Sequence, residues 1–503
     1  MSDNVIQHPR TKIPDDNDLH VAGLLHDDPE AGTAPVDPEP TWESDAARWY
    51  DRREAYTDND LGRARRLIDL AAGSIRYCFT WDAWMIYEDG RWGRNTSGAL
   101  GRYAHQVGAD LLAESRHLES KYAETATKLY KQANTCGNKA KIQNMIGVAQ
   151  DIEGVSVQPD EFDANPWLLG IENGVVDLRS GTWRRAVRGD MITHRAGVKW
   201  EQGATCPTWD RFLMEIMCED AELVSYLQRA VGYSLTGSIQ EQCLFFLYGA
   251  GSNGKSTFLT TIQALMGSYA RQSSKDLLLE RRHDPHPVEF ADLQGRRMVV
   301  CGEIKERCRL AEDKVKTLTG GDRINARWMR ENPFEFDPTH TIWQPGNHKP
   351  TIKGMDDGIW RRIRLVPFLA SFKDEQKDES LPARLREELP GILLWAVRGC
   401  MAWQREGLGQ PEAVKQATGS YRQEMDQYRE FFEDECVLGP GREVMSGHLY
   451  ERFRSWAESA GFKKIPNRPA WSAELRRRGF HPRNSGGRRW VGLDLRAPPQ
   501  PDE

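Results

Sequence analysis

One segment near the middle of the chain restricts the fold more than any other. Residues 243–267, CLFFLYGAGSNGKSTFLTTIQALMG, begin with six apolar residues, pass through a glycine-rich turn and continue with apolar residues at Phe258, Leu259, Ile262 and Leu265. The short apolar run indicates a buried strand, and spacings of three and four residues indicate one face of a helix. A strand that turns directly into a helix is the unit of α/β folds, so the sequence predicts an α/β core.

The turn in this segment has the spacing of a phosphate-binding loop. Gly249, Gly254, Lys255 and Ser256 satisfy G-x-x-x-x-G-K-[ST] between a predicted strand and a predicted helix. Glycines let backbone N–H groups approach phosphates, and the helix N-terminus adds positive potential there. We expect Lys255 to neutralise the β- and γ-phosphates of a nucleoside triphosphate and Ser256 to hold Mg²⁺.

Three more strand-like runs follow the loop, and each has polar residues at one end. Residues 298–301 lead to Glu303, and the run HTIWQPGNHKP contains Asn347. A carboxylate beside the loop can polarise an attacking water and bind Mg²⁺, and an amide can contact the γ-phosphate. Arg361 and Arg362 precede the last run, where one of them could reach the γ-phosphate of a neighbouring subunit in a ring. A surface acid, a turn amide and a solvated arginine pair are the alternatives.

Basic residues gather around a Gly-Gly turn between the second and third of the four strand runs. A predicted hairpin through Glu331–Pro333 could place these residues beside a phosphate backbone, and a base could stack on Trp328. A solvated hairpin with a buried tryptophan is the alternative. The basic residues are Lys314, Lys316, Arg323, Arg327 and Arg330.

Charge is segregated along the 503 residues, although the net charge is only −6. Residues 1–60 contain five Lys and Arg against fifteen Asp and Glu, and six prolines occur in the first 40 residues, which predicts a disordered acidic leader. Residues 442–496 contain thirteen Lys and Arg against five Asp and Glu, which favours a partner with phosphates. The alternative is a basic face that docks on the acidic remainder of the chain.

Several classes of protein are disfavoured. The nine cysteines include no C-x-x-C pair, and His283 and His286 have no evident third ligand, so neither a zinc nor a redox site is expected. The longest apolar runs fall far short of the ~20 residues that cross a bilayer. The N-terminus lacks the apolar core of a secretory signal, so a cytoplasmic protein is expected, in a bacterial host cytoplasm if a phage or plasmid encodes it.

The order of these motifs resembles that of superfamily 3 helicases. YGAGSNGKSTFL, LQGRRMVVCGEI, KTLTGGDRINAR, PGNHKP and IWRRIRLVPF are similar to the Walker A, Walker B, B′, sensor-1 and arginine-finger regions. The chain most resembles the phage and plasmid primase-helicases related to the poxvirus D5 protein and the satellite-phage P4 α protein. Two upstream segments, NPWLLGIENGVVDLRSGTWRR and LQRAVGYSLTGSIQEQCLFFLYG, resemble the D5 N-terminal module. LYERFRSWAESAG and WSAELRRRGFHPRNSGGRRWVGLDL resemble its winged-helix-like C-terminal segment.

The resemblance implies an α/β fold with an AAA+-like P-loop NTPase core, a mostly helical D5-type N-terminal domain and a C-terminal winged-helix-like domain. The implied organisation is a disordered acidic leader (1–56), a helical domain with a small β insert (57–236), the ATPase core (237–375), a helical lid or linker (376–440), a basic DNA-binding domain (441–496) and a tail (497–503).

The resemblance also implies an ATP hydrolase and DNA helicase that uses Mg²⁺, forms a homo-hexameric ring and moves 3′ to 5′ on single-stranded DNA at forks. Glu303 would be the catalytic acid and would bind Mg²⁺ with Ser256, Asn347 would be the sensor, and Arg361 or Arg362 the finger, with Arg362 preferred. The implied nucleotide contacts are Gly249, Ala250, Gly251, Ser252, Asn253, Gly254, Lys255, Ser256 and Thr257. The implied DNA contacts are Lys316, Arg327, Arg330, Arg476, Arg477, Arg478, Arg488 and Arg489.

The sequence departs from the family pattern in two ways. Glu303 is a single acid where many relatives have two, and the leader is too short for an upstream primase domain, so a separate primase or polymerase is an expected partner. Two other functions remain open: a P-loop ATPase of another kind, such as a packaging motor or a nucleotide kinase, and a DNA-binding regulator switched by ATP. No N-K-x-D motif is present, which disfavours a switch GTPase.

Overall fold

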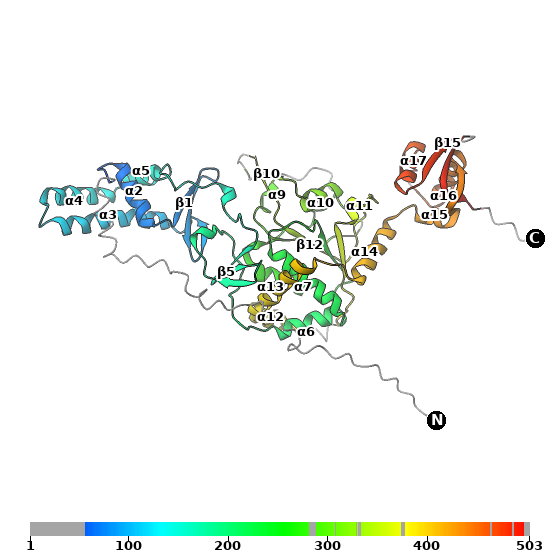
Figure 1. Ribbon diagram of the computed structural model, residues 1–503, viewed down its shortest axis with the longest axis horizontal. Helices are drawn as coiled ribbons and strands as arrows, with labels where there is room; N and C mark the ends of the chain where they lie inside the picture. Colours follow the sequence, from blue (N-terminus) through cyan, green and yellow to red (C-terminus); the bar gives the residue numbers. More distant parts are fainter. Residues whose placement is uncertain are drawn as a thin grey trace, which may run out of the picture.

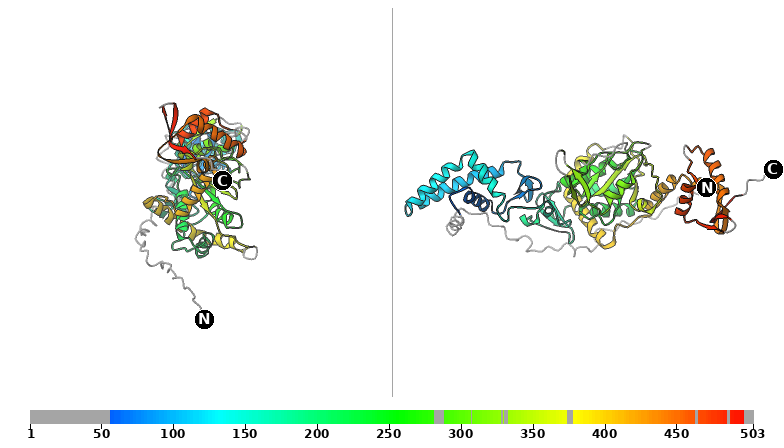
Figure 2. Two further views of the ribbon diagram at one scale, coloured as in Figure 1. Left: turned by 90° about the vertical axis from the view of Figure 1, so that its right-hand side faces the viewer. Right: turned by 90° about the horizontal axis from the view of Figure 1, so that it is seen from above.

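The computed structural model describes residues 56–280, 288–306, 308–327, 329, 333–373, 378–462, 465–484 and 487–496. A helical N-terminal region, a central parallel sheet with helices and a small C-terminal unit follow one another along the long axis (Figures 1 and 2). The mixed α/β architecture agrees with the prediction. Nearly all of the predicted leader, the tail and both histidines of the HDPH segment lie outside the described residues.

The N-terminal region combines a helical core with two small antiparallel sheets. Helix α2 (Asp60–Ala71) begins at Asn59, whose side chain accepts a hydrogen bond of 2.9 Å from the Gly62 backbone N–H. It packs with α3 (Ala99–Leu118), α4 (Ala123–Cys136) and α5 (Lys139–Ala149) around buried residues such as Leu67 and Val107. The sheets contain β1 (Ile75–Cys78), β2 (Ala83–Glu88) and β3 (Arg91–Arg94), and β4 (Leu168–Ile171), β5 (Gly174–Asp177) and β6 (Thr182–Arg184).

The central sheet has the strand order β13-β7-β12-β9-β8, and its neighbouring strands are all parallel. The strands are β7 (Leu244–Tyr248), β8 (Ala270–Gln272), β9 (Met298–Val300), β12 (Thr341–Gly346) and β13 (Ile363–Pro367), which confirms the four predicted runs. Leu244 and Phe246 join one hydrophobic cluster, and Phe245 and Leu247 join another. The run is apolar throughout because both faces of the strand are covered.

One face of the sheet packs on α6 (Pro207–Ile216), α7 (Ala221–Leu235), α8 (Lys255–Met266) and α13 (Leu389–Glu406). The hydrophobic cluster on this face includes residues from Leu169 to Val414 and joins residues on both sides of position 236. The boundary suggested by the sequence at residue 236 is therefore not a boundary of the core. Hydrophobic periodicity shows which side of α7 is apolar, but it does not show that the sheet covers that side.

The other elements of the central part flank the sheet and the loop. They are α9 (Val288–Ala291), α10 (Glu312–Thr319), α11 (Asp357–Trp360), α12 (Leu381–Glu387) and α14 (Glu412–Met425), with the antiparallel pair β10 (Ile324–Arg327) and β11 (Pro333–Phe336). This pair agrees with the predicted hairpin, although Trp328 and Arg330 near its tip lie outside the described residues.

The C-terminal unit packs three helices on an antiparallel sheet of order β14-β16-β15. Its elements are α15 (Arg429–Glu435), β14 (Cys436–Met445), α16 (Ser446–Ser459), α17 (Arg468–Arg477), β15 (His481–Asn484) and β16 (Arg488–Leu495). Phe453 stacks on Trp471 with ring centroids 3.7 Å apart, and Phe431 from α15 belongs to the same core. The unit therefore begins before residue 441, the start taken from the sequence. No helix in the described ranges is long and apolar enough to span a bilayer.

Candidate functional site

The loop between β7 and α8 is a strained, tightly packed turn. Gly251, Ser252 and Gly254 have φ angles of 99°, 46° and 85°, in the left-handed region. A Cβ on Gly249 would lie 2.2 Å from the Phe368 carbonyl oxygen, and one on Gly254 would lie 2.4 Å from the side chain of Ile216. Both positions therefore require glycine.

This loop also presents unused hydrogen-bond donors. Within the described chain, the backbone N–H groups of residues 250–254 have no hydrogen-bond partner in the protein. Two hydrogen bonds fix the loop to the segment that follows β13. The Asn253 amide donates to the Phe368 carbonyl at 3.1 Å, and the Phe372 N–H donates to the Ser252 carbonyl at 2.9 Å. Fixed donors at the start of a helix suit an anion such as a phosphate chain.

Lys255, the first residue of α8, is held inside the loop with only 4% of its surface exposed. Its Nζ donates to the Gly249 carbonyl at 2.6 Å and to Asn347 Oδ1 at 2.9 Å. Burial lowers the pKa of Lys255, while the negative charge of Glu303 acts in the opposite direction. Two residues predicted from separate motifs are thus in direct contact.

Glu303 and Asn347 follow neighbouring strands, β9 and β12. Ile304 forms a parallel bridge with Gly346, so the two polar residues lie at the same edge of the sheet. Gln344, which is 1% exposed, donates to the Gly302 carbonyl at 2.8 Å and fixes the backbone before Glu303. Sequence reasoning missed Gln344, although a lone amide within an apolar strand could have drawn attention to it.

The groups suited to Mg²⁺ are Ser256 and Glu303, both exposed beside the loop. A hydroxyl and a carboxylate are hard oxygen ligands, and a magnesium ion bound to phosphates needs only one or two such ligands from the protein. Within the described ranges, no group of three His, Cys, Asp or Glu side chains is arranged to hold a metal ion by itself. The residues present fit a nucleotide-bound ion.

The two predicted finger arginines have different surroundings. Arg362 is 9% exposed, and its guanidinium donates to Thr319 Oγ1 at 3.1 Å and to the Gly358 carbonyl at 2.6 Å. Burial lowers its pKa. Arg361 is exposed and donates to Gln242 Oε1 at 3.3 Å. The sequence favours Arg362 as the finger, but Arg361 is the accessible arginine of the pair. Both residues lie in the turn before β13, and the guanidinium of Arg362 is bound to Thr319 and Gly358.

A cleft of about 640 Å³ opens beside the loop. It is bordered by Ser252 and Gly254 of the loop, Arg211 of α6 and Arg384 of α12, and Arg384 is paired with Asp378. These residues come from three segments that are distant in the sequence. No sequence motif predicts that they line one cleft.

The predicted basic residues of the hairpin region have different surroundings. Lys316 on α10 lies 3.6 Å from the carboxylate of Asp356, and Arg327 is exposed at the end of β10. Arg330 lies outside the described residues.

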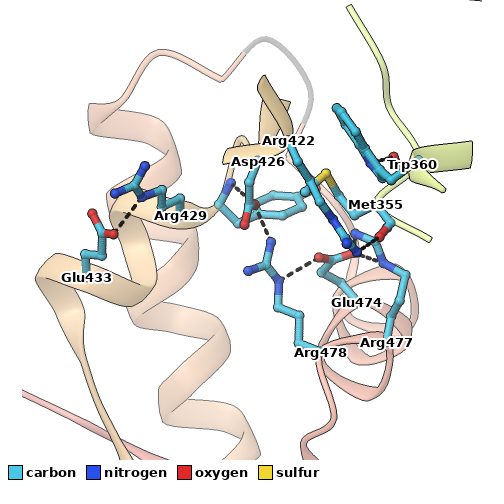
Figure 3. Close-up of polar contacts among 11 residues, drawn as sticks. Met355, Trp360, Arg422, Asp426, Arg429, Glu433, Glu474, Arg477 and Arg478 are labelled. Atoms are coloured by element: carbon cyan, nitrogen blue, oxygen red, sulfur yellow. Dashed lines mark hydrogen bonds and ion pairs between the residues drawn. The ribbon is translucent and has the colours of Figure 1, made fainter. Parts of the chain in front are cut away.

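The C-terminal arginines differ in their partners and exposure. Arg478 is paired with Asp426 and with Glu474 at 2.7 Å (Figure 3). Its guanidinium lies 4.6 Å from the centroid of the Phe432 ring. Arg477 also pairs with Glu474. Arg483 and Arg489 lie 2.7 and 3.9 Å from the carboxylate of Glu443, whereas Arg476 and Arg488 are exposed.

Comparisons with known families match two parts of the chain. The family described as D5 N terminal like matches residues 64–218, and a family of unknown function, DUF5906, matches residues 247–362. The second match covers the loop and the segments of Glu303, Asn347 and Arg361. A solved structure, the apo structure of the NrS-1 C terminal region, covers 85% of this chain and 88% of its own at 11% identity, with a TM-score of 0.48.

Two viral relatives are similar over part of their length. "Putative helicase L207/L206" of Acanthamoeba polyphaga mimivirus is 30% identical over 385 residues, which cover 71% of this chain and 39% of the relative. "Primase D5" of fowlpox virus (strain NVSL) is 26% identical over 245 residues, which cover 46% of this chain and 31% of the relative. The chain thus spans less than half of these relatives. Together with the D5 N-terminal-like match, these relatives support a D5-like primase-helicase family for this chain.

Proposed function

We propose that this chain is an ATP-dependent DNA helicase of replication that works as a ring, with six subunits as the expected number. The observation that carries the proposal is the position of four residues relative to the central sheet. Lys255, Asn347 and Glu303 gather at the carboxyl edge of the strands, and Arg361 lies at the amino edge.

The separation of the two edges favours action between subunits. Strand β13 has five residues and spans about 16 Å, so Arg361 lies at the end of the sheet opposite to the loop of its own chain. In a ring, the same arginine would reach the γ-phosphate held by the next subunit, as arginine fingers do in other NTPases. Its exposure supports this role.

The nucleotide would lie along the glycine-rich loop. Backbone N–H groups of residues 250–254 and Lys255 would bind the phosphates, with Ser256 and Thr257 at the helix start, and the adjoining cleft would accept the nucleoside. Mg²⁺, held beside Ser256 and Glu303, would neutralise phosphate charge. Glu303 would orient the attacking water and Asn347 would contact the γ-phosphate.

DNA would be contacted by basic residues in two regions. Arg327 is exposed at the end of β10 and Lys316 is half-buried on the neighbouring α10, and the exposed Arg476 and Arg488 lie on the C-terminal unit. Opening a base-pair step costs about 1.4 kcal/mol of stacking. Movement of the hairpin during hydrolysis would draw single-stranded DNA through the ring, 3′ to 5′ by family resemblance.

A forked-DNA unwinding assay with parallel measurement of ATP hydrolysis tests the proposal. Wild-type protein should do both, and Lys255→Ala should do neither, because the phosphates lose their main cationic partner. Lys128→Ala, at an exposed pair with Glu124 on α4, is the matched control and should resemble wild type. Unwinding that survives in Lys255→Ala, or hydrolysis without unwinding by wild type, would contradict the helicase assignment.

A further inference from the structure

Helix α14 makes several polar and aromatic contacts with the segment that follows Asn347. Lys349 Nζ donates to both carboxylate oxygens of Glu424, at 2.8 and 2.9 Å, and only 14% of the lysine side chain is exposed. The same ammonium lies 4.8 Å from the ring centroid of Tyr248 and 5.5 Å from that of Tyr421. The Tyr421 hydroxyl also donates to the Pro350 carbonyl. Since Asn347 is two residues from Lys349, α14 determines where its amide meets Lys255.

The same helix holds the turn that presents Arg361. Arg422 donates to the Met355 carbonyl at 2.7 Å (Figure 3). It also donates to Asp357 Oδ1 at 2.9 Å. Trp360 packs edge-on against Tyr421, with ring centroids 5.2 Å apart. Asp357 and Trp360 are the two ends of α11, and Arg361 is its C-terminal cap. Successive residues of α14 therefore contact the segments of both predicted γ-phosphate residues.

The C-terminal end of α14 is joined to the C-terminal unit. Asp426 follows the last residue of the helix and pairs with Arg478 at the end of α17, which also pairs with Glu474 (Figure 3). The side chains of Arg478, Asp426 and Glu474 are only 20%, 15% and 12% exposed. This joint is shielded from solvent, so the ion pairs are screened less than exposed pairs.

We propose that α14 is a positioning helix for ATP hydrolysis, and this proposal rests on the proposed function. Glu424 and Arg422 set the positions of Asn347 and Arg361, and Asp426 links those positions to the C-terminal unit. DNA bound to the C-terminal unit therefore changes the rate of hydrolysis. A helix is stiff over this length, so a shift of its C-terminal end is transmitted to the two segments packed along it.

The positioning role is tested with Glu424→Gln, which removes the charge that holds Lys349. We expect kcat for ATP hydrolysis to fall about 5-fold or more with KM nearly unchanged, because Asn347 is required mainly in the transition state. Glu433→Gln is the control: it breaks an exposed pair with Arg429 (2.6 Å) and does not contact residues 347–361. Equal kcat values for the two variants, or a rise in KM alone, would overturn the positioning role.

The link to the C-terminal unit is tested with Asp426→Asn. Single-stranded DNA should stimulate hydrolysis by wild type and by Glu433→Gln, whereas the ratio of stimulated to basal rate in Asp426→Asn should fall to about one. Its affinity for the oligonucleotide should stay unchanged. Wild-type-like stimulation in Asp426→Asn, or no stimulation of an active wild type, would overturn the link.

Failure of the proposed function has a different signature. If wild type hydrolyses no ATP, the helicase assignment fails by itself, and amide hydrogen exchange then decides the coupling. Adding the oligonucleotide should alter exchange across residues 347–361 in wild type and not in Asp426→Asn. The same exchange change in both proteins, or in neither, would overturn the coupling.

Discussion

Side chains of the same chemistry differ in this protein according to what surrounds them. Arg361 is exposed, whereas the guanidinium of Arg362 is bound to Thr319 and to the Gly358 carbonyl. Lys255 is buried and bound to the Gly249 carbonyl and to Asn347, which suits the phosphate-binding role proposed for it. At the scale of residues, burial and hydrogen-bond partners distinguish a side chain that is free to contact another molecule from one that stabilises the fold.

Replacing the two arginines separately should give different defects. Arg361→Ala should lower kcat for ATP hydrolysis by about 10³-fold with an unchanged melting temperature, because the finger acts only in the transition state. Arg362→Ala should destabilise the fold by about 1–3 kcal/mol, since Thr319 and the Gly358 carbonyl lose their donor. Steady-state kinetics and thermal unfolding measure the two effects. The reverse pattern would return the finger role to Arg362.

A buried histidine predicts how stability depends on pH. His340 is 3% exposed, neither ring nitrogen has a partner within the described chain, and burial lowers its pKa from 6.5 to about 4. The unfolded chain therefore binds a proton that the folded chain does not between pH 6.5 and 4. This group's contribution is complete above pH 6.5 and is lost as pH falls, by about 1.4 kcal/mol per unit.

Urea unfolding at several pH values checks this expectation. His340→Leu should show a shallower loss of stability below pH 6.5 than wild type. Some loss should remain, because burial also lowers the pKa of His194 to about 4. His481→Gln, at an exposed position on β15, is the control and should keep the wild-type slope. A wild-type slope in His340→Leu would mean that this histidine is protonated in the folded protein.

At the scale of elements, periodicity predicts existence and type well and partners poorly. The apolar runs became β7, β9, β12 and β13, and the amphipathic pattern after the loop became α8. The order of the strands puts β12, which precedes Asn347, between β7 and β9. The close contact of α7 with α13 could not be predicted, because it depends on two glycines, 232 and 399, far apart in the sequence.

That helix contact gives a sharp stability prediction. A Cβ on Gly232 would lie 2.1 Å from the backbone nitrogen of Cys400, so Gly232→Ala should destabilise the protein by at least about 1–3 kcal/mol. A Cβ on Gly101 in α3 would meet open space within the described chain, so Gly101→Ala should be stabilising by about 0.5–1 kcal/mol. Chemical denaturation of both variants tests the contrast. Equal effects would show that α7 and α13 can move apart at little cost.

At the scale of the whole molecule, positive charge is concentrated in the C-terminal unit. The chain carries a net charge of −6, yet its C-terminal segment is basic, and that unit lies at one end of the row of domains (Figure 1). Part of its positive charge is used internally, by the pairs of Arg477 and Arg478 with Glu474 and of Arg483 with Glu443. The exposed Arg476 and Arg488 remain for a phosphate partner.

Salt dependence should separate these two uses of charge. Arg488→Ala should weaken DNA binding and lower the slope of log K against log salt by about one, as expected for one lost phosphate contact. Arg483→Ala should change the slope little, because its guanidinium is paired with Glu443 at 2.7 Å. Fluorescence anisotropy titrations over a range of salt concentrations measure both slopes. Identical slopes for the two variants would contradict the division.

The sequence by itself determined the α/β core, the glycine-rich turn between a strand and a helix, and the strands that precede Glu303 and Asn347, because these depend on local spacing and on short apolar runs. Only the tertiary structure decided which arginine is accessible, which helices share the core and that α14 joins the C-terminal unit to the sheet. Such features arise where side chains distant in sequence meet, and local patterns contain no information about which partner a given face will find.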